Sequence, residues 1–224
     1  MILAGIDGSR GGWIAVLHDR GAGTWRTEVA ACWTDLPAAD RLAVDMPIGL
    51  PDGGRRGCDF AARRLLGPRR GASVFIGLRR PLLGFRTYAE ANAWAKADGA
   101  GLAKQAWFLL PKIREIDRAV APEDQDRIHE CHPELAFLRL GGGPIAESKR
   151  TPEGLAIRRA LLEDAGVPIA SLLAGLDRRR AAPDDLLDAA ALALTAGRIA
   201  DGQATCLAAA PPRDARGLRM EIWY

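Results

Sequence analysis

Five carboxylates stand where a charged side chain is unexpected unless it has a partner. Asp7 ends the first apolar run and precedes a glycine-rich turn, and Asp45 ends a later short apolar run. Glu130 lies on a later short segment, 127–131, that is predicted to be a strand. Asp185 and Asp188 lie three positions apart in the last helical segment, so they share one face of that helix. An ionised carboxylate in apolar surroundings is costly unless it is paired or binds a cation.

These acids predict a site for a hard divalent cation. Mg²⁺ and Mn²⁺ prefer oxygen ligands such as carboxylates. Two such cations about 4 Å apart can activate a water molecule and stabilise the leaving oxygen during phosphodiester cleavage. Without a cation the carboxylates would repel one another, or one would hold a proton. The candidate metal ligands and catalytic acids are therefore Asp7, Asp45, Glu130, Asp185 and Asp188.

Each acid also has a structural interpretation. Asp7 and Asp45 could be turn residues, because an aspartate side chain can hydrogen-bond the backbone that follows it. Asp185 fits an acid at the N-terminus of a helix. Glu130 could be an ordinary strand acid. Asp188 could lie on the solvated edge of its helix, although a charge among alanines and leucines is unexpected without a partner.

Basic and imidazole side chains supply candidate phosphate contacts. Lys149 and Lys112 lie near predicted helix starts or in loops, and His132 could orient a water molecule or bind the scissile phosphate. The structural alternatives are solvated lysines and a histidine that hydrogen-bonds a helix end. Four arginine pairs would form a phosphate-tracking strip if they shared one face, and would otherwise be a solvated surface: Arg55–Arg56, Arg63–Arg64, Arg69–Arg70 and Arg79–Arg80.

Composition indicates one globular domain. The chain has 224 residues, 48% of them hydrophobic, and a net charge of +3 that permits a polyanionic partner without requiring one. Its four cysteines form no CxxC pair, which argues against zinc spacing and predicts reduced thiols in a cytoplasmic protein. No signal peptide and no membrane-spanning segment are expected.

The elements that must position the acids follow from apolar periodicity. The two apolar runs around the first glycine-rich turn predict a β-hairpin, and a third strand is expected at 25–31. Further strands are expected at 42–46, where Pro47 stops the strand, at 127–131 and at 218–223. Three meandering strands at the start favour an antiparallel portion of a sheet.

Helical spacing and start signals predict helices between and after these strands. A mostly helical insertion is expected over about 56–125, where substrate selectivity would most easily reside. His132-Pro133-Glu134 opens a helix. The other expected helices cover 35–40, 58–66, 87–98, 102–120 with a break at Pro111, 151–165 and 183–199.

Ordered motifs along the chain resemble a domain-of-unknown-function family, family 429, whose members are predicted to be RNase H-like nucleases. The opening turn has Ser9 where cysteine is expected in many relatives. The matching motifs are Gly5-Ile6-Asp7-Gly8-Ser9-Arg10-Gly11-Gly12-Trp13, Asp45-Met46-Pro47-Ile48-Gly49-Leu50-Pro51, Cys58-Asp59, Ser73-Val74-Phe75, Pro111-Lys112-Ile113, Glu130-Cys131-His132-Pro133-Glu134, Ser148-Lys149-Arg150-Thr151, Asp184-Asp185-Leu186-Leu187-Asp188-Ala189 and Met220-Glu221-Ile222-Trp223.

The resemblance implies a single α/β domain over 1–224 with an RNase H-like fold. Such a fold has a mixed five-stranded sheet, its first three strands antiparallel, with helices on both faces. It implies acids on strand one, strand four and the last helix, which map to Asp7, Asp45 and Asp185 or Asp188. The expected activity is a metal-dependent nuclease that uses Mg²⁺ or Mn²⁺, with a nucleic acid as its partner.

Two other functions fit the same residues. An actin-like small-molecule phosphotransferase also places an aspartate before the glycine turn of its first hairpin, although such enzymes usually need two similar domains. A non-catalytic nucleic-acid-binding protein could keep the fold. The sequence does not show whether the substrate would be DNA or RNA, or whether cleavage would be endonucleolytic or exonucleolytic. It also leaves the oligomeric state open, and a homodimer is one possibility.

Overall fold

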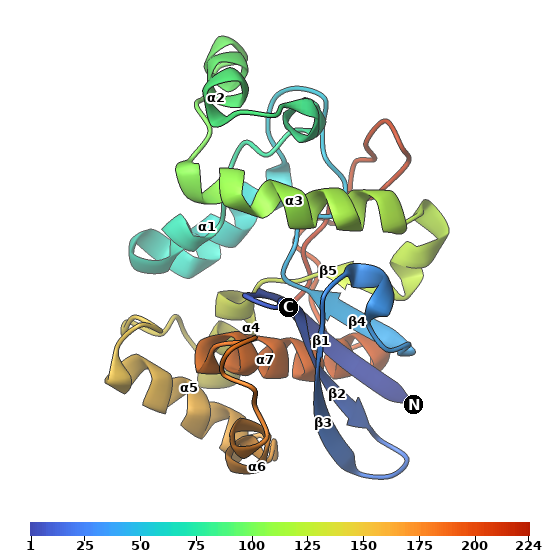
Figure 1. Cartoon of the computed structure of the whole chain (residues 1–224), viewed down its shortest axis with the longest axis vertical. Coiled ribbons are helices and arrows are strands. Elements are labelled where there is room, and N and C mark those ends of the chain that lie inside the picture. The colour runs from blue at the N-terminus through green and yellow to red at the C-terminus, as the bar shows by residue number, and fades with distance from the viewer.

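The computed structural model describes residues 1–224 and has one mixed five-stranded sheet with helices on both faces (Figure 1). The strand order is β3-β2-β1-β4-β5. β1, β2 and β3 are antiparallel, and β4 and β5 continue the sheet parallel to β1. The predicted α/β class and sheet directions are confirmed. The strands are β1 Ile2–Ser9, β2 Gly12–Asp19, β3 Thr24–Ala30, β4 Arg41–Val44 and β5 Ile128–Glu130.

The structure has seven α-helices. α1, α2 and α3 all lie between β4 and β5, where the sequence predicts a mostly helical insertion. None of the helices is both long and apolar enough to cross a membrane. The α-helices are α1 Gly57–Arg70, α2 Tyr88–Ala97, α3 Lys104–Ala119, α4 Pro133–Gly141, α5 Pro152–Asp164, α6 Ile169–Ala174 and α7 Pro183–Ala200. Short 3-10 helices are η1 Trp33–Asp35, η2 Gly71–Ser73, η3 Arg80–Gly84 and η4 Pro122–Asp126.

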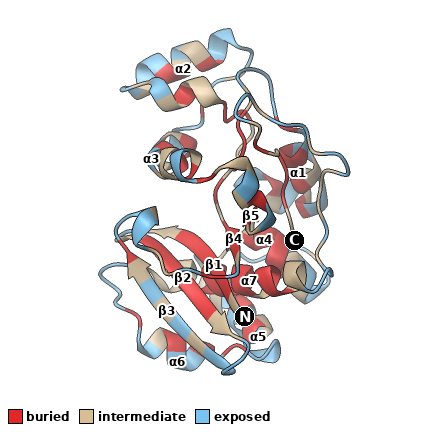
Figure 2. Ribbon diagram, turned by 90° about the vertical axis from the view of Figure 1, so that its right-hand side faces the viewer, coloured by how far each residue is buried: buried red, intermediate tan, exposed pale blue.

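The strands at the centre of the sheet are buried on both faces because successive side chains point to opposite sides. In β1, Ala4 and Ile6 join the core that contains α2 and α3, whereas Leu3 joins the core that contains α7. Figure 2 shows β1, β2 and α7 buried over most of their length, whereas β3 alternates between exposed and intermediate residues up to the buried Ala30. This double burial explains the unbroken apolar runs of the first hairpin.

α7 packs closely on β1 because Gly5 has no side chain. A Cβ atom at Gly5 would lie 1.9 Å from the backbone oxygen of Ala189 and 2.1 Å from the backbone nitrogen of Ala193. The approach is therefore backbone against backbone, which only glycine permits. It brings the end of β1, which carries Asp7, beside the helix that carries Asp188.

Three expectations about secondary structure are wrong, and one helix was not predicted. No α-helix forms at 35–40, where Pro37 limits the chain to η1 and an extended segment. Helix α3 is not broken at Pro111, because this proline lies on the exposed side, where the carbonyl one turn earlier can meet water. The segment 218–223 forms only isolated bridges, since its backbone bonds to several loops in turn. Helix α6 is an element that the sequence analysis missed.

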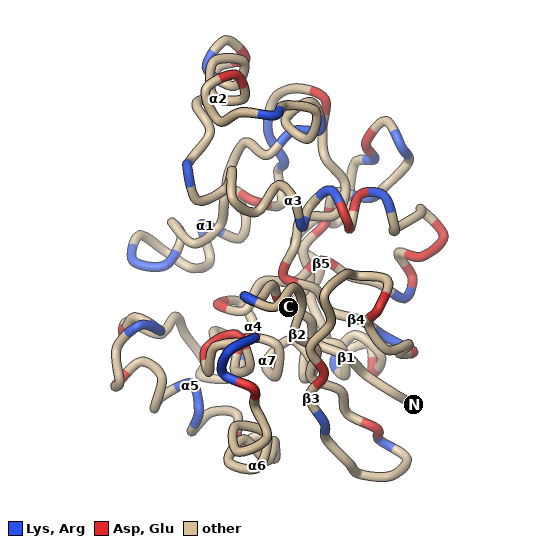
Figure 3. Tube along the Cα trace, in the orientation of Figure 1, with Lys and Arg blue, Asp and Glu red and all other residues tan.

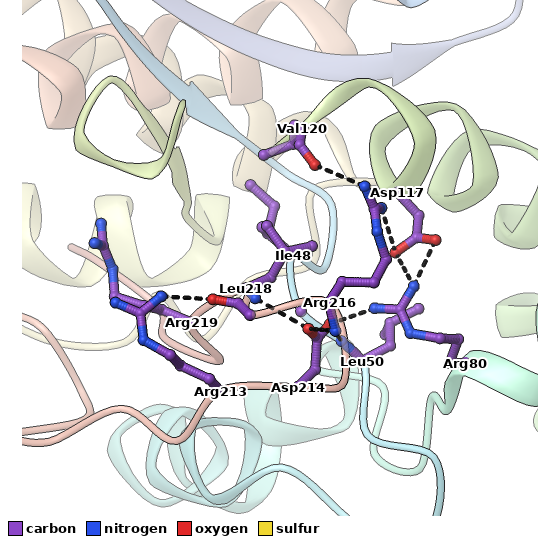
Figure 4. Close-up of polar contacts among 12 residues, drawn as sticks. Ile48, Leu50, Arg80, Asp117, Val120, Arg213, Asp214, Arg216, Leu218 and Arg219 are labelled. Atoms are coloured by element: carbon purple, nitrogen blue, oxygen red, sulfur yellow. Dashed lines mark hydrogen bonds and ion pairs between the residues drawn. The ribbon is translucent and has the colours of Figure 1, made fainter. Parts of the chain in front are cut away.

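A buried ionic cluster fastens the C-terminal segment to the helical segment (Figure 4). The fully buried carboxylate of Asp214 accepts backbone N–H groups from Leu50, Arg216 and Leu218 at 2.8–3.0 Å and pairs with Arg80. Arg80 also donates to Asp117 of α3 at 2.6 Å. Three segments that are distant in the sequence therefore meet at one carboxylate.

Replacing Asp214 by alanine is expected to lower the free energy of unfolding by about 3–5 kcal/mol, because it leaves three backbone N–H groups without an acceptor and removes one of the two carboxylates that bind Arg80. Urea unfolding followed by circular dichroism measures the loss. Arg213→Ala is the matched control, since Arg213 is exposed and its only recorded hydrogen bond goes to the carbonyl of Gly217. Its expected cost is below about 1 kcal/mol. Equal losses in the two variants would contradict a structural role for the cluster.

Candidate functional site

One cavity gathers the predicted acids. Its volume is about 490 Å³, and it lies where β1, β4, β5 and α7 meet the segment 72–78 and α3. The predicted site residues all line it: Asp7, Asp45, Glu130, His132, Lys149, Asp185 and Asp188. Positions up to 181 residues apart in the sequence, such as 7 and 188, therefore share a single site.

Asp7 and Asp188 form the buried part of the site. Asp7 is 7% exposed and Asp188 is 2% exposed. Burial raises the pKa of Asp7 well above its ordinary value, and the negative charges of Asp45 and Asp188 raise it further. One oxygen of Asp7 accepts the N–H of Gly8 at 2.6 Å, and Asp7 has no ion-pair partner. The structural interpretation of Asp7 as a turn residue accounts for only one of its two oxygens.

Asp45 has no partner within the protein. It directly follows β4, it is half-buried, and neither a hydrogen bond nor an ion pair to its carboxylate is present. Burial raises its pKa, while His132 and Lys149 oppose the shift. A half-buried carboxylate that faces a cavity without a partner is an open binding position.

Lys149 supplies the positive charge at the site. Its ammonium lies 2.5 Å from Asp188 and 3.7 Å from Asp184. The loop that carries it is held against α5 because Gly154 has no side chain; a Cβ atom there would lie 2.0 Å from the carbonyl oxygen of Ser148. Buried Arg158 fixes the same loop by donating to the carbonyl of Glu147 at 3.1 Å. Lys149 is thus a positioned residue rather than a solvated lysine.

Glu130 belongs to a separate network in the cavity wall. One of its oxygens accepts Arg56 at 2.5 Å, and the other accepts the N–H of Ile48 at 2.7 Å. Arg56 is itself buried and also pairs with Asp59 at 3.2 Å. Since both oxygens are engaged, Glu130 is held in place as a structural acid, and we do not count it among the proposed ligands. The sequence alone identifies Arg56 only as a member of an arginine pair, and the structure shows its partners.

His132 combines a structural and an accessible nitrogen. Its Nδ1 accepts the N–H of Glu134 at 3.2 Å, so His132 caps α4 as its structural interpretation expects. In the neutral ring the proton then lies on Nε2, which is 3.4 Å from Oγ of Ser73 at the cavity. The imidazole therefore presents a hydrogen-bond donor to the site. Beside it, Glu134 pairs with Arg158 at 2.7 Å, a contact that sequence reasoning missed.

Asp185 and Lys112 lie at the edge of the site. Asp185 accepts the N–H of Ala182 at 2.9 Å, as an acid at a helix start should, and its pKa is raised by burial. Lys112 donates to the carbonyl of Gly12 and lies 5.0 Å from the ring of Trp13. Burial lowers the pKa of Lys112. Both residues line the cavity, although each already has a structural partner.

The arginine pairs do not form one continuous strip. Figure 3 shows basic residues distributed over several separate segments. Arg56 and Arg79 are 1% exposed, and Arg80 belongs to the buried cluster at Asp214. Arg63 and Arg70 donate to backbone carbonyls. Five of the eight arginines thus make internal contacts, which leaves the cavity rather than a basic strip as the place for a ligand.

The donor set fits a hard divalent cation by its chemistry. Asp7 and Asp45 have no ion-pair partner, and one oxygen of Asp188 is free of hydrogen bonds. As the side chains lie, however, no three His, Cys, Asp or Glu residues are arranged to hold a metal ion. Binding would therefore require the carboxylates to turn toward a common centre. Without a cation, their mutual repulsion opposes this movement. The same repulsion adds to burial in raising the pKa values of Asp7 and Asp188.

Stability without divalent cations is expected to fall as pH rises from about 4 to about 7. Burial raises the pKa of Asp188 to about 7 even though Lys149 opposes the shift, and the pKa of Asp7 is raised as well. The folded state binds the protons of these two carboxyl groups more tightly than the unfolded state does. Their contribution to the free energy of unfolding is therefore fully present below about pH 4. It falls by on the order of 2 kcal/mol as the pH rises to about 7.

Urea unfolding in EDTA at several pH values measures this loss. Asp188→Asn should flatten the slope, and Mg²⁺ or Mn²⁺ should restore stability more at pH 8 than at pH 5, because ligands must lose protons to bind a cation. A stability that rises between pH 4 and pH 7 in EDTA, with no change in slope for the variant, would contradict the prediction.

The fold and the cavity define an α/β protein with a carboxylate-rich pocket at the ends of β1 and β4. The chain belongs to the family of proteins of unknown function DUF429, whose model matches residues 5–213. No curated protein and no solved structure matches the chain.

Proposed function

We propose that the protein is a divalent-metal-dependent nuclease that hydrolyses phosphodiester bonds in a nucleic acid. The observation that carries the proposal is the convergence of Asp7, Asp45 and Asp188 on one cavity that also contains Lys149 and His132. Three acids from a strand end, a second strand end and a helix supply the oxygen donors that this chemistry needs. The RNase H-like resemblance of the sequence motifs supports the same function.

Mg²⁺ or Mn²⁺ would be held by Asp7, Asp45 and Asp188, with Asp185 at the edge of the set. When bound, the cation supplies the positive charge that activates a water molecule and stabilises the leaving oxygen. Asp45 offers the freest carboxylate, because nothing in the protein binds it. Burial of Asp7 and Asp188 keeps competing water away from the ligands and strengthens their attraction for a cation.

Lys149 and His132 act on the phosphate in this proposal. The ammonium of Lys149 balances Asp188 in the cation-free protein and can turn toward an incoming phosphate, which a cavity with unpaired acids would otherwise repel. The Nε2–H of His132 can donate a hydrogen bond to a phosphate oxygen or to the leaving oxygen. The capping contact at Nδ1 keeps that proton on Nε2.

Cleavage of a labelled substrate panel tests the proposal. The panel contains single- and double-stranded DNA, RNA, an RNA–DNA hybrid and a branched junction. We expect cleavage of at least one substrate with Mg²⁺ or Mn²⁺ and none in EDTA. If no substrate is cleaved while calorimetry shows cation binding, the nuclease proposal fails. Thermal stabilisation by ATP in the same buffers would then favour phosphotransfer.

A further inference from the structure

The cavity has an apolar wall beside its carboxylates. The wall comes from the segment 72–78 and from α3, and its main side chains are Val74, Phe75, Leu78 and Leu109. Phe75 and Leu109 pack against the core on one side but remain partly exposed, and both line the cavity. Metal-assisted phosphate chemistry needs none of these side chains. We therefore expect the ligand to have an apolar part that contacts this wall.

The volume of the cavity limits what can enter it. About 490 Å³ is within the range of pockets that enclose a small ligand, and one nucleotide is a ligand of that size. Asp188 is 2% exposed, so a phosphate must enter the cavity to approach it. The bases of a duplex are stacked inside the helix, and proteins that enclose a base take it from a single strand or turn it out of the stack. An intact duplex therefore cannot place a stacked base against this wall.

We propose that the cavity binds one unpaired nucleotide of a single strand, with its phosphate at Asp7, Asp45 and Asp188 and its base against Phe75 and Leu109. This inference rests on the proposed function and names its substrate class. The arrangement uses both halves of the cavity: the acids and a cation take the phosphate, while the aromatic ring and the leucine take the planar base. Because every base has an apolar face, the wall gives little sequence preference.

Binding without cleavage tests this inference. The wild-type protein in Mn²⁺ serves as the background protein, and fluorescence anisotropy follows binding of a labelled 12-nucleotide strand with cleavage-resistant linkages, alone or annealed to its complement. We expect the single strand to bind at least about tenfold more tightly than the duplex. Phe75→Ala and Leu109→Ala should each weaken single-strand binding by about tenfold, as removal of a base-stacking side chain does. Phe75→Tyr, which keeps the ring, should bind like the background protein.

Phe108→Ala is the matched control. Phe108 neighbours Leu109 on α3 and is 66% exposed, but it does not line the cavity. Its loss should leave binding unchanged, and unfolding midpoints show whether each variant is folded. Duplex binding as tight as single-strand binding would overturn the inference, as would folded Phe75→Ala and Leu109→Ala variants that bind like Phe108→Ala.

The two proposals fail separately. A wild-type protein that cleaves nothing but shows the expected binding pattern would overturn the proposed nuclease activity and support the proposed nucleotide-binding site. If the wild-type protein cleaves duplexes as fast as single strands, and Phe75→Ala changes neither binding nor cleavage, the proposed nucleotide-binding site is overturned. The proposed nuclease activity would then still stand.

Discussion

Replacing Asp7 by asparagine is expected to reduce cleavage at least about a thousandfold while the protein stays folded, a loss of roughly 4 kcal/mol of transition-state stabilisation. Asparagine keeps the shape of the side chain and one oxygen, so the N–H of Gly8 retains its acceptor. It removes the charge that a divalent cation needs at the buried end of the site. Initial rates of cleavage in Mg²⁺ and Mn²⁺ measure the loss.

The same substitution is expected to stabilise the cation-free protein at neutral pH. Burial and the neighbouring carboxylates raise the pKa of Asp7, which means that its ionised form weakens the folded state. A stabilised but inactive variant separates a functional acid from a structural one. Asp52→Asn is the control, because Asp52 is an exposed aspartate outside the cavity. Asp7→Asn with wild-type cleavage would remove Asp7 from the catalytic set.

Replacing Gly5 by alanine is expected to destabilise the protein by at least about 3 kcal/mol. The new Cβ would overlap the backbone of α7 at Ala189 and Ala193, and a backbone in the middle of a helix cannot move aside as a flexible side chain can. Trimming the side chain of Ala189 would give no relief, because the obstructing atoms belong to the main chain. Urea unfolding measures the cost.

Cleavage should fall as well in any Gly5→Ala protein that folds, because α7 must move away from β1 and carry Asp188 away from Asp7. Gly143→Ala is the matched control: a Cβ atom there meets nothing within 4 Å. Its stability and cleavage should match those of the wild type. A Gly5→Ala protein as stable as this control would contradict the close packing of α7 on β1.

Local patterns in the sequence were sufficient for most of the fold. The first hairpin, the buried strand before Asp45 and the long last helix are each specified by their own apolar spacing and end signals. The errors lie where tertiary contacts override local preference. Pro111 stays within α3 because the helix is held by the core beneath it, and the segment 218–223 meets loops instead of extending the sheet.

The sequence also identified the candidate metal-binding acids, but it could not show which of them are free to bind a cation. Asp45 and Glu130 look alike in the sequence analysis, because each lies at or near the end of a short predicted strand. The structure separates them, because Arg56 and the N–H of Ile48 occupy both oxygens of Glu130, whereas Asp45 has no partner. Arg56 is 74 positions away from Glu130, so no local sequence pattern predicts this ion pair.

By itself, then, the sequence determined most of the elements, the direction of the first hairpin and the set of candidate acids, because periodicity and charge act over a few neighbouring residues. The tertiary structure alone decided that Asp7, Asp45 and Asp188 share a cavity with Lys149 and with the apolar wall of Phe75 and Leu109. It decided this through close approaches, such as that of α7 to Gly5, between segments that are distant in the chain. Such contacts depend on how whole elements pack, and no local pattern specifies them.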